Sequence, residues 1–122
     1  MDFIIVVKVA DMQTNITKFF SSLMKTTYKK KNFQVVFLAE YDGFMTKGKI
    51  IHSIDWELSQ VQWKEFGLSR LESKDIYEIW SIPNPDGNEW ALIEALKTIY
   101  KCPIIIEDGS FNFVEKWYDH IR

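Results

Sequence analysis

The chain has 122 residues, 47% of them apolar and 26% charged, a composition typical of one folded globular domain rather than a disordered chain. A single cysteine excludes an internal disulfide framework. The formal net charge of −2 hides an asymmetry, because residues 1–50 hold eight bases and four acids whereas residues 51–122 hold seven bases and thirteen acids. Such a division indicates a partner of opposite charge for one face of the domain, although two solvated faces would explain it as well.

The beginning of the chain predicts a strand, a helix and a second strand. The nearly continuous β-branched run at 3–9 is typical of a strand covered on both faces. Asp11 is a good N-cap for a helix whose apolar residues recur from Met12 to Thr27 at spacings of three, four and seven. Residues 33–41 form the second apolar run and predict the second strand.

The middle of the chain is less regular. Asp42 and Gly43 indicate a turn, after which residues 49–56 alternate and predict a third strand with Ile50, His52, Ile54 and Trp56 on one face. Residues 57–74 fit a strand and a helix equally well. Residues 75–82 alternate again and predict another strand.

The last third begins at a strong turn signature, Asn-Pro-Asp-Gly at 84–87. The pattern after this turn predicts a helix at 89–101, a short strand at 103–107 and a final helix at 110–121. The residues of the first helix that are predicted to face inward are Leu92, Ile93, Leu96, Ile99 and Tyr100. The element order β-α-β-β-(β)-β-α-β-α predicts one α+β domain over residues 1–122, a layered α/β sandwich with a single mixed sheet of about 4–5 strands.

The inventory of reactive side chains argues against most enzyme classes. His52, His120 and Cys102 are too few and too scattered for a zinc site, and no glycine-rich phosphate loop follows a strand. Acid pairs such as Asp55 and Glu57 leave open a small carboxylate-based hydrolase, although such pairs are usually solvated. We therefore expect no catalytic residues, no metal and no cofactor. The pI of about 5.7 argues against direct nucleic-acid binding.

Neither export nor membrane insertion is expected. The apolar run near the beginning is five residues long, shorter than the core of a signal peptide, and no stretch approaches about 20 apolar residues. Together with the single cysteine, this predicts a cytoplasmic protein that does not enter the membrane.

The predicted helix at 89–101 carries the most informative outward face. Trp90, Glu94, Lys97 and Lys101 share a stripe away from its apolar residues. A tryptophan one turn before an acid suits a contact surface, because the ring supplies area and the carboxylate supplies charge. The alternative is that Trp90 packs under a neighbouring loop.

Residues 87–107 resemble the barstar family, small acidic inhibitors of a secreted bacterial ribonuclease. The shared pattern is Gly87-Asn88, a short helix with Ala-Leu twice and an acid before the second, and a Pro-led apolar strand ending in Glu107. The resemblance implies that Glu94 matches the principal inhibitory acid and that Gly87 and Asn88 match the loop that approaches the enzyme. Trp90 stands where the family has another acid.

The leading hypothesis is therefore an immunity protein that occludes the active site of a cognate bacterial toxin, a nuclease with a basic cleft being the class we expect. The alternatives are another small interaction module or a phage-encoded inhibitor. The candidate contacts form two clusters. The first cluster contains Asp86, Gly87, Asn88, Glu89, Trp90 and Glu94, and the second cluster contains the acids Asp55, Glu57, Glu107 and Asp108.

Overall fold

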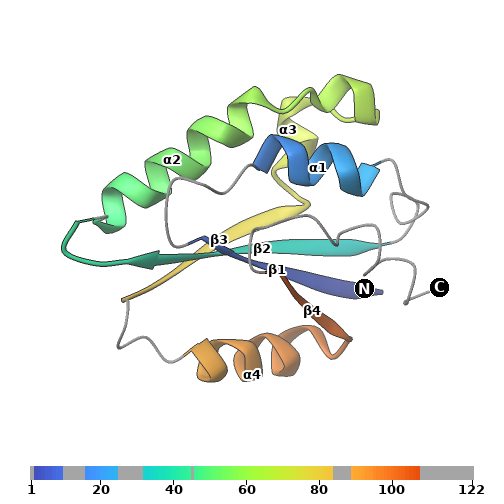
Figure 1. Cartoon of the computed structure of the whole chain (residues 1–122). Helices are drawn as coiled ribbons and strands as arrows, with labels where there is room; N and C mark the ends of the chain where they lie inside the picture. The colour runs from blue at the N-terminus through green and yellow to red at the C-terminus, as the bar shows by residue number, and fades with distance from the viewer. Residues whose placement is uncertain (1, 10–15, 25–31, 45, 84–88, 108–122) are drawn as a thin grey trace.

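A computed structural model describes residues 2–9, 16–24, 32–44, 46–83 and 89–107 of the chain (Figure 1). Its strands are β1 (Phe3–Val9), β2 (Phe33–Tyr41), β3 (Tyr77–Pro83) and β4 (Ile104–Glu107). Its helices are α1 (Ile16–Met24), α2 (Lys47–Gln60), the 3₁₀ helix η2 (Trp63–Phe66), α3 (Arg70–Ser73) and α4 (Glu89–Tyr100).

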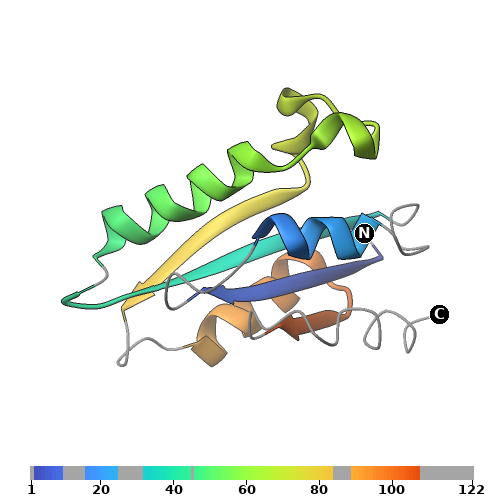
Figure 2. The same ribbon diagram turned by 45° about the horizontal axis from the view of Figure 1, so that its top comes forward.

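The four strands form one sheet in the order β3-β2-β1-β4, and each neighbouring pair is parallel. A parallel pair needs a crossover, which α1 provides between β1 and β2, the α2-η2-α3 segment between β2 and β3, and α4 between β3 and β4. The first two crossovers cover one face of the sheet and α4 covers the other (Figures 1 and 2). The result is a three-layer α/β sandwich.

The core has two parts because both faces of the sheet are covered. The larger part lies under α1, α2 and η2, where the rings of Phe19, Phe20 and Phe37 meet edge to face with centroids 5.2–6.3 Å apart. The smaller part lies between the sheet and α4 and contains Leu96. β1 supplies both parts, since its side chains alternate between the faces and all but that of Lys8 are buried.

The strand predicted at 49–56 is wrong, because these residues lie within α2. The Thr46 hydroxyl caps this helix by accepting a hydrogen bond from the Lys49 amide at 3.4 Å. Its buried residues Ile50, Ile54 and Leu58 are spaced by four, a spacing that also satisfies the alternation of a strand. The sheet is consequently parallel throughout the described strands, not mixed.

The other described elements agree with the sequence. The predicted strands at 3–9, 33–41, 75–82 and 103–107 and the predicted helix at 89–101 are confirmed within one or two residues, as is the layered α/β architecture. Residues 57–74 contain the end of α2, then η2 and α3. Asp11 and the helix predicted at 110–121 lie outside the described residues.

Candidate functional site

The outward stripe of α4 is exposed as predicted. Ile93 and Leu96 are buried against the sheet, whereas Trp90 is 69% exposed and Glu94 and Lys97 face solvent. We call Trp90, Glu94 and Lys97 the α4 outer face. The interpretation that Trp90 packs under a neighbouring loop is therefore wrong. The inward placement of Ile99 is also wrong, because this side chain is 60% exposed beside the buried stripe.

An ion pair lies within the α4 outer face. Lys97 Nζ and Glu94 Oε1 are 3.2 Å apart, and more than half of each side chain is exposed. A solvated pair at this spacing contributes only about 0.3–0.5 kcal/mol. The carboxylate of Glu94 is therefore easily re-paired with a cation of a partner.

The rest of the first cluster is less fully described. Asp86, Gly87 and Asn88 lie outside the described residues, so their predicted contacts remain predictions. Glu89 begins α4, but nothing is described of its side chain. The described part of this cluster is therefore Trp90 and Glu94.

In the second cluster, Glu57 makes a hydrogen bond within the protein. Glu57 reaches from α2 to the beginning of α1, where its Oε1 accepts a hydrogen bond from the Ile16 amide at 3.1 Å. Burial raises the pKa of Glu57, while this hydrogen bond opposes the rise. Its neighbour Asp55 is exposed. Nothing is described of the Glu107 side chain, and Asp108 lies outside the described residues, so the grouping of these acids stays a prediction.

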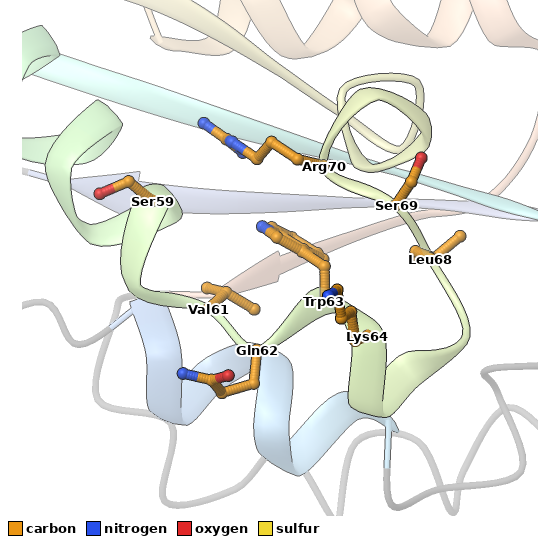
Figure 3. Close-up of a pocket in the computed structure, with 8 residues that line it drawn as sticks. All are labelled: Ser59, Val61, Gln62, Trp63, Lys64, Leu68, Ser69 and Arg70. Atoms are coloured by element: carbon orange, nitrogen blue, oxygen red, sulfur yellow. The ribbon is translucent and has the colours of Figure 1, made fainter.

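A hollow that the sequence did not indicate lies where the chain passes from α2 through η2 to α3 (Figure 3). It has a volume of about 590 Å³, and we call it the α2–α3 hollow. Its lining is Ser59, Val61, Gln62, Trp63, Lys64, Leu68, Ser69 and Arg70. These residues belong to the segment 57–74, whose sequence fits a helix and a strand equally well. The Ser-x-x-Glu pattern at 69–72 was a usable signal, because it forms the capping box that starts α3.

Within the described residues, no three His, Cys, Asp or Glu side chains gather in a way that could hold a metal ion. Burial raises the pKa of the Cys102 thiol, which disfavours the nucleophilic thiolate. The Tyr100 hydroxyl donates to Glu78 Oε1 at 2.5 Å and ties the end of α4 to β3.

Comparison of the chain with family models, with curated proteins and with solved structures finds no significant match. In the part of the chain that the structure describes, the helices are all too short or too polar to cross a membrane.

Proposed function

We propose that this protein is an immunity protein, which binds a cognate bacterial toxin domain and blocks its active site with the α4 outer face. The observation that carries the proposal is the 69% exposure of Trp90 one helical turn from the exposed Glu94. The proposed toxin is a nuclease, because a nuclease cleft is basic and accepts phosphates, whose charge a carboxylate can imitate.

The two side chains contribute in different ways. Tryptophan is among the residues that most often carry the binding energy of an interface, since its large ring fills a pocket and loses little conformational freedom. The carboxylate of Glu94 adds long-range attraction to a basic cleft and raises the association rate.

The helix that presents these side chains is held before binding. Leu96 packs in the core between the sheet and α4, and Tyr100 anchors the end of the helix to Glu78. A preorganised surface pays less ordering entropy when it binds. The proposed mechanism is stoichiometric occlusion without catalysis or a cofactor, and the proposed compartment is the cytoplasm, where a nuclease toxin would reach its substrate.

Co-expression with the product of a neighbouring toxin-like reading frame tests this function. The intact chain should restore growth, and the purified pair should form a one-to-one complex. Trp90→Ala should weaken this complex by at least about 30-fold, as expected for an anchor worth about 2 kcal/mol. Failure of the intact chain both to rescue growth and to bind would overturn the proposal.

Matched variants on the opposite side of the sheet control for loss of fold. Trp56 on α2 is 60% exposed, so Trp56→Ala removes a comparable exposed ring. Glu65→Lys reverses an exposed acid on η2 as Glu94→Lys does on α4. Both control variants should rescue growth as the wild type does. Loss of rescue with the controls but not with Trp90→Ala and Glu94→Lys would move the contact away from α4.

A further inference from the structure

We infer that the α2–α3 hollow is a binding site for a small organic anion, one that joins a carboxylate or phosphate group to an apolar body. The site lies on the face of the sheet that α4 does not cover, so it is independent of the proposed toxin contact (Figures 1 and 3). Its volume of about 590 Å³ lies within the usual range of ligand sites, about 300–1,000 Å³.

The charge of the lining is unlike that of the whole chain. The net charge of the protein is −2, yet the charged residues of the hollow are Lys64 and Arg70, and no acid lines it. Among the described residues, no carboxylate forms an ion pair with either cation. The nearby Glu72 accepts the hydrogen bond of the Ser69 amide at 3.2 Å and forms no ion pair with either cation. The hollow therefore carries two positive charges that an anion can neutralise.

Neutral groups hold the guanidinium of Arg70 in place. Its Nη1 lies 3.4 Å from Ser73 Oγ and 3.3 Å from Tyr77 Oη, two weak hydrogen bonds that leave its charge uncompensated. In Figure 3 the Arg70 side chain extends in the direction of Ser59, as does the ring of Trp63. A guanidinium presents a planar fork of donors that matches a carboxylate or a phosphate. This residue is the anion-binding group of the proposed site.

The apolar part of the lining is built around a buried tryptophan. Trp63 is only 5% exposed, its indole N–H donates to the Leu58 carbonyl at 3.1 Å, and its ring lies against Phe20 with centroids 4.9 Å apart. The Leu68 amide donates to the Trp63 carbonyl at 3.0 Å and closes the turn between η2 and α3. With Val61 and the partly buried Leu68, Trp63 forms the apolar wall of the hollow, in the same lining as the two cations. Such a wall favours a ligand with an apolar body over a bare inorganic anion.

Titration of the ¹⁵N-labelled full chain tests the site, with phenylphosphate, benzoate and inorganic phosphate as probes. At least one aromatic anion should shift the Trp63 indole signal with saturation below about 10 mM, and inorganic phosphate should bind at least about tenfold more weakly. The tighter of the two aromatic probes identifies the anionic group. Absence of a saturating shift with both would overturn the site, and equal binding of inorganic phosphate would overturn the role of the apolar wall.

Variants assign the contact to the hollow. Arg70→Gln should weaken the aromatic anion at least about tenfold, because it removes a charge-assisted hydrogen bond. Lys74→Gln removes another exposed cation, just after α3 and outside the lining, and should leave binding unchanged. If Arg70→Gln fails to fold, Lys64→Gln takes its place with the same expectation. Unchanged affinity in the folded lining variant, or equal losses in the lining variant and Lys74→Gln, would overturn the assignment.

Discussion

Glu57 on α2 caps α1, because its Oε1 accepts the hydrogen bond of the Ile16 amide at 3.1 Å across 41 residues of sequence. The first amides of a helix lack partners within it, and a carboxylate there accepts a hydrogen bond from one of them and interacts favourably with the positive end of the helix dipole. The two helices that cover the same face of the sheet are therefore joined by a hydrogen bond as well as by packing.

Removal of this cap should destabilise the protein. Glu57→Ala should lower the free energy of unfolding by about 1 kcal/mol, the usual cost of losing a helix-capping side chain. Urea unfolding at neutral pH measures the change. Asp55→Ala, at an exposed position two residues earlier on α2, is the control and should change the free energy of unfolding by less than about 0.5 kcal/mol.

The same carboxyl should give the stability a pH dependence. Burial raises the pKa of Glu57, so the folded chain retains its proton at pH values where the unfolded chain has lost it. The part of the stability that depends on the protonation of Glu57 is complete below the unfolded pKa and is lost as the pH rises through the raised folded pKa, whereas the hydrogen bond to the Ile16 amide remains. Glu57→Gln keeps an acceptor oxygen but has no charge to desolvate.

Urea unfolding of the wild type and Glu57→Gln across the mildly acidic range measures this effect. The stability of the variant relative to that of the wild type should increase with pH. Glu65→Gln, on the exposed side of η2, should follow the wild type throughout. If the stability of Glu57→Gln and that of the wild type changed in parallel with pH, the partly buried Glu57 carboxyl would have an ordinary pKa.

Two glycines should respond in opposite directions to alanine. Gly67 ends η2 with φ at +76°, a conformation that costs about 1–2 kcal/mol for a residue with a Cβ, so Gly67→Ala should be destabilising. Gly48 lies in the first turn of α2, and an added Cβ would meet no atom within 4 Å. Gly48→Ala should stabilise the chain by about 0.5–1 kcal/mol, measured by the same urea unfolding. If both substitutions changed the free energy of unfolding in the same direction, the result would contradict the structure of the η2–α3 turn.

The hydrogen bond between Tyr100 and Glu78 should be visible in an alkaline titration. This bond, aided by burial and by the negative charge of Glu78, raises the pKa of Tyr100 to about 12. Phenolate absorbance should show a late step that Tyr100→Phe removes and Glu78→Gln moves to lower pH. The stability due to this phenol should be complete below about pH 10 and be lost as the pH rises toward 12. A late step that persists in Tyr100→Phe would contradict the assignment.

Truncation of a core phenylalanine and of a surface phenylalanine should have different effects on stability. Phe20 is fully buried and its ring contacts those of Phe19, Phe37 and Trp63, so Phe20→Ala should cost about 3–5 kcal/mol. Phe44, 93% exposed between β2 and α2, should tolerate alanine within about 0.5 kcal/mol. Thermal unfolding of both variants tests this contrast, and similar losses of stability would contradict the placement of one of the rings.

The elements that the sequence predicts well are those whose pattern has one explanation. The apolar runs of β1 and β2 are short and rich in β-branched or aromatic residues, so strands are expected at their observed positions. The segment at 49–56 fails because Ile50 and Ile54, spaced by four, lie on one face of a helix and on one face of a strand. What decides between them is the crossover that parallel β2 and β3 require, and this is a property of the whole sheet.

The residues of the candidate sites likewise include some that the sequence predicts and some that it does not. The outward positions of Trp90 and Glu94 follow from the helical period of α4 and could be predicted. The contact between Glu57 and Ile16 and the presence of Lys64 and Arg70 in the lining of one hollow depend on how segments pack, and no local spacing reveals them. Acidic character alone therefore did not separate a capping carboxylate from a surface carboxylate.

The central place of β1 has a consequence for synthesis on the ribosome. Synthesis runs from the amino end, so among the described strands β1 is made before its partner β2. Its other edge stays open until β4, the last described strand, has left the exit tunnel. Between the synthesis of β1 and that of β4, the growing chain thus exposes one edge of an apolar strand rich in Val and Ile, a template for mispairing with other nascent chains. Chaperones that shield emerging apolar segments should therefore raise the yield of folded protein.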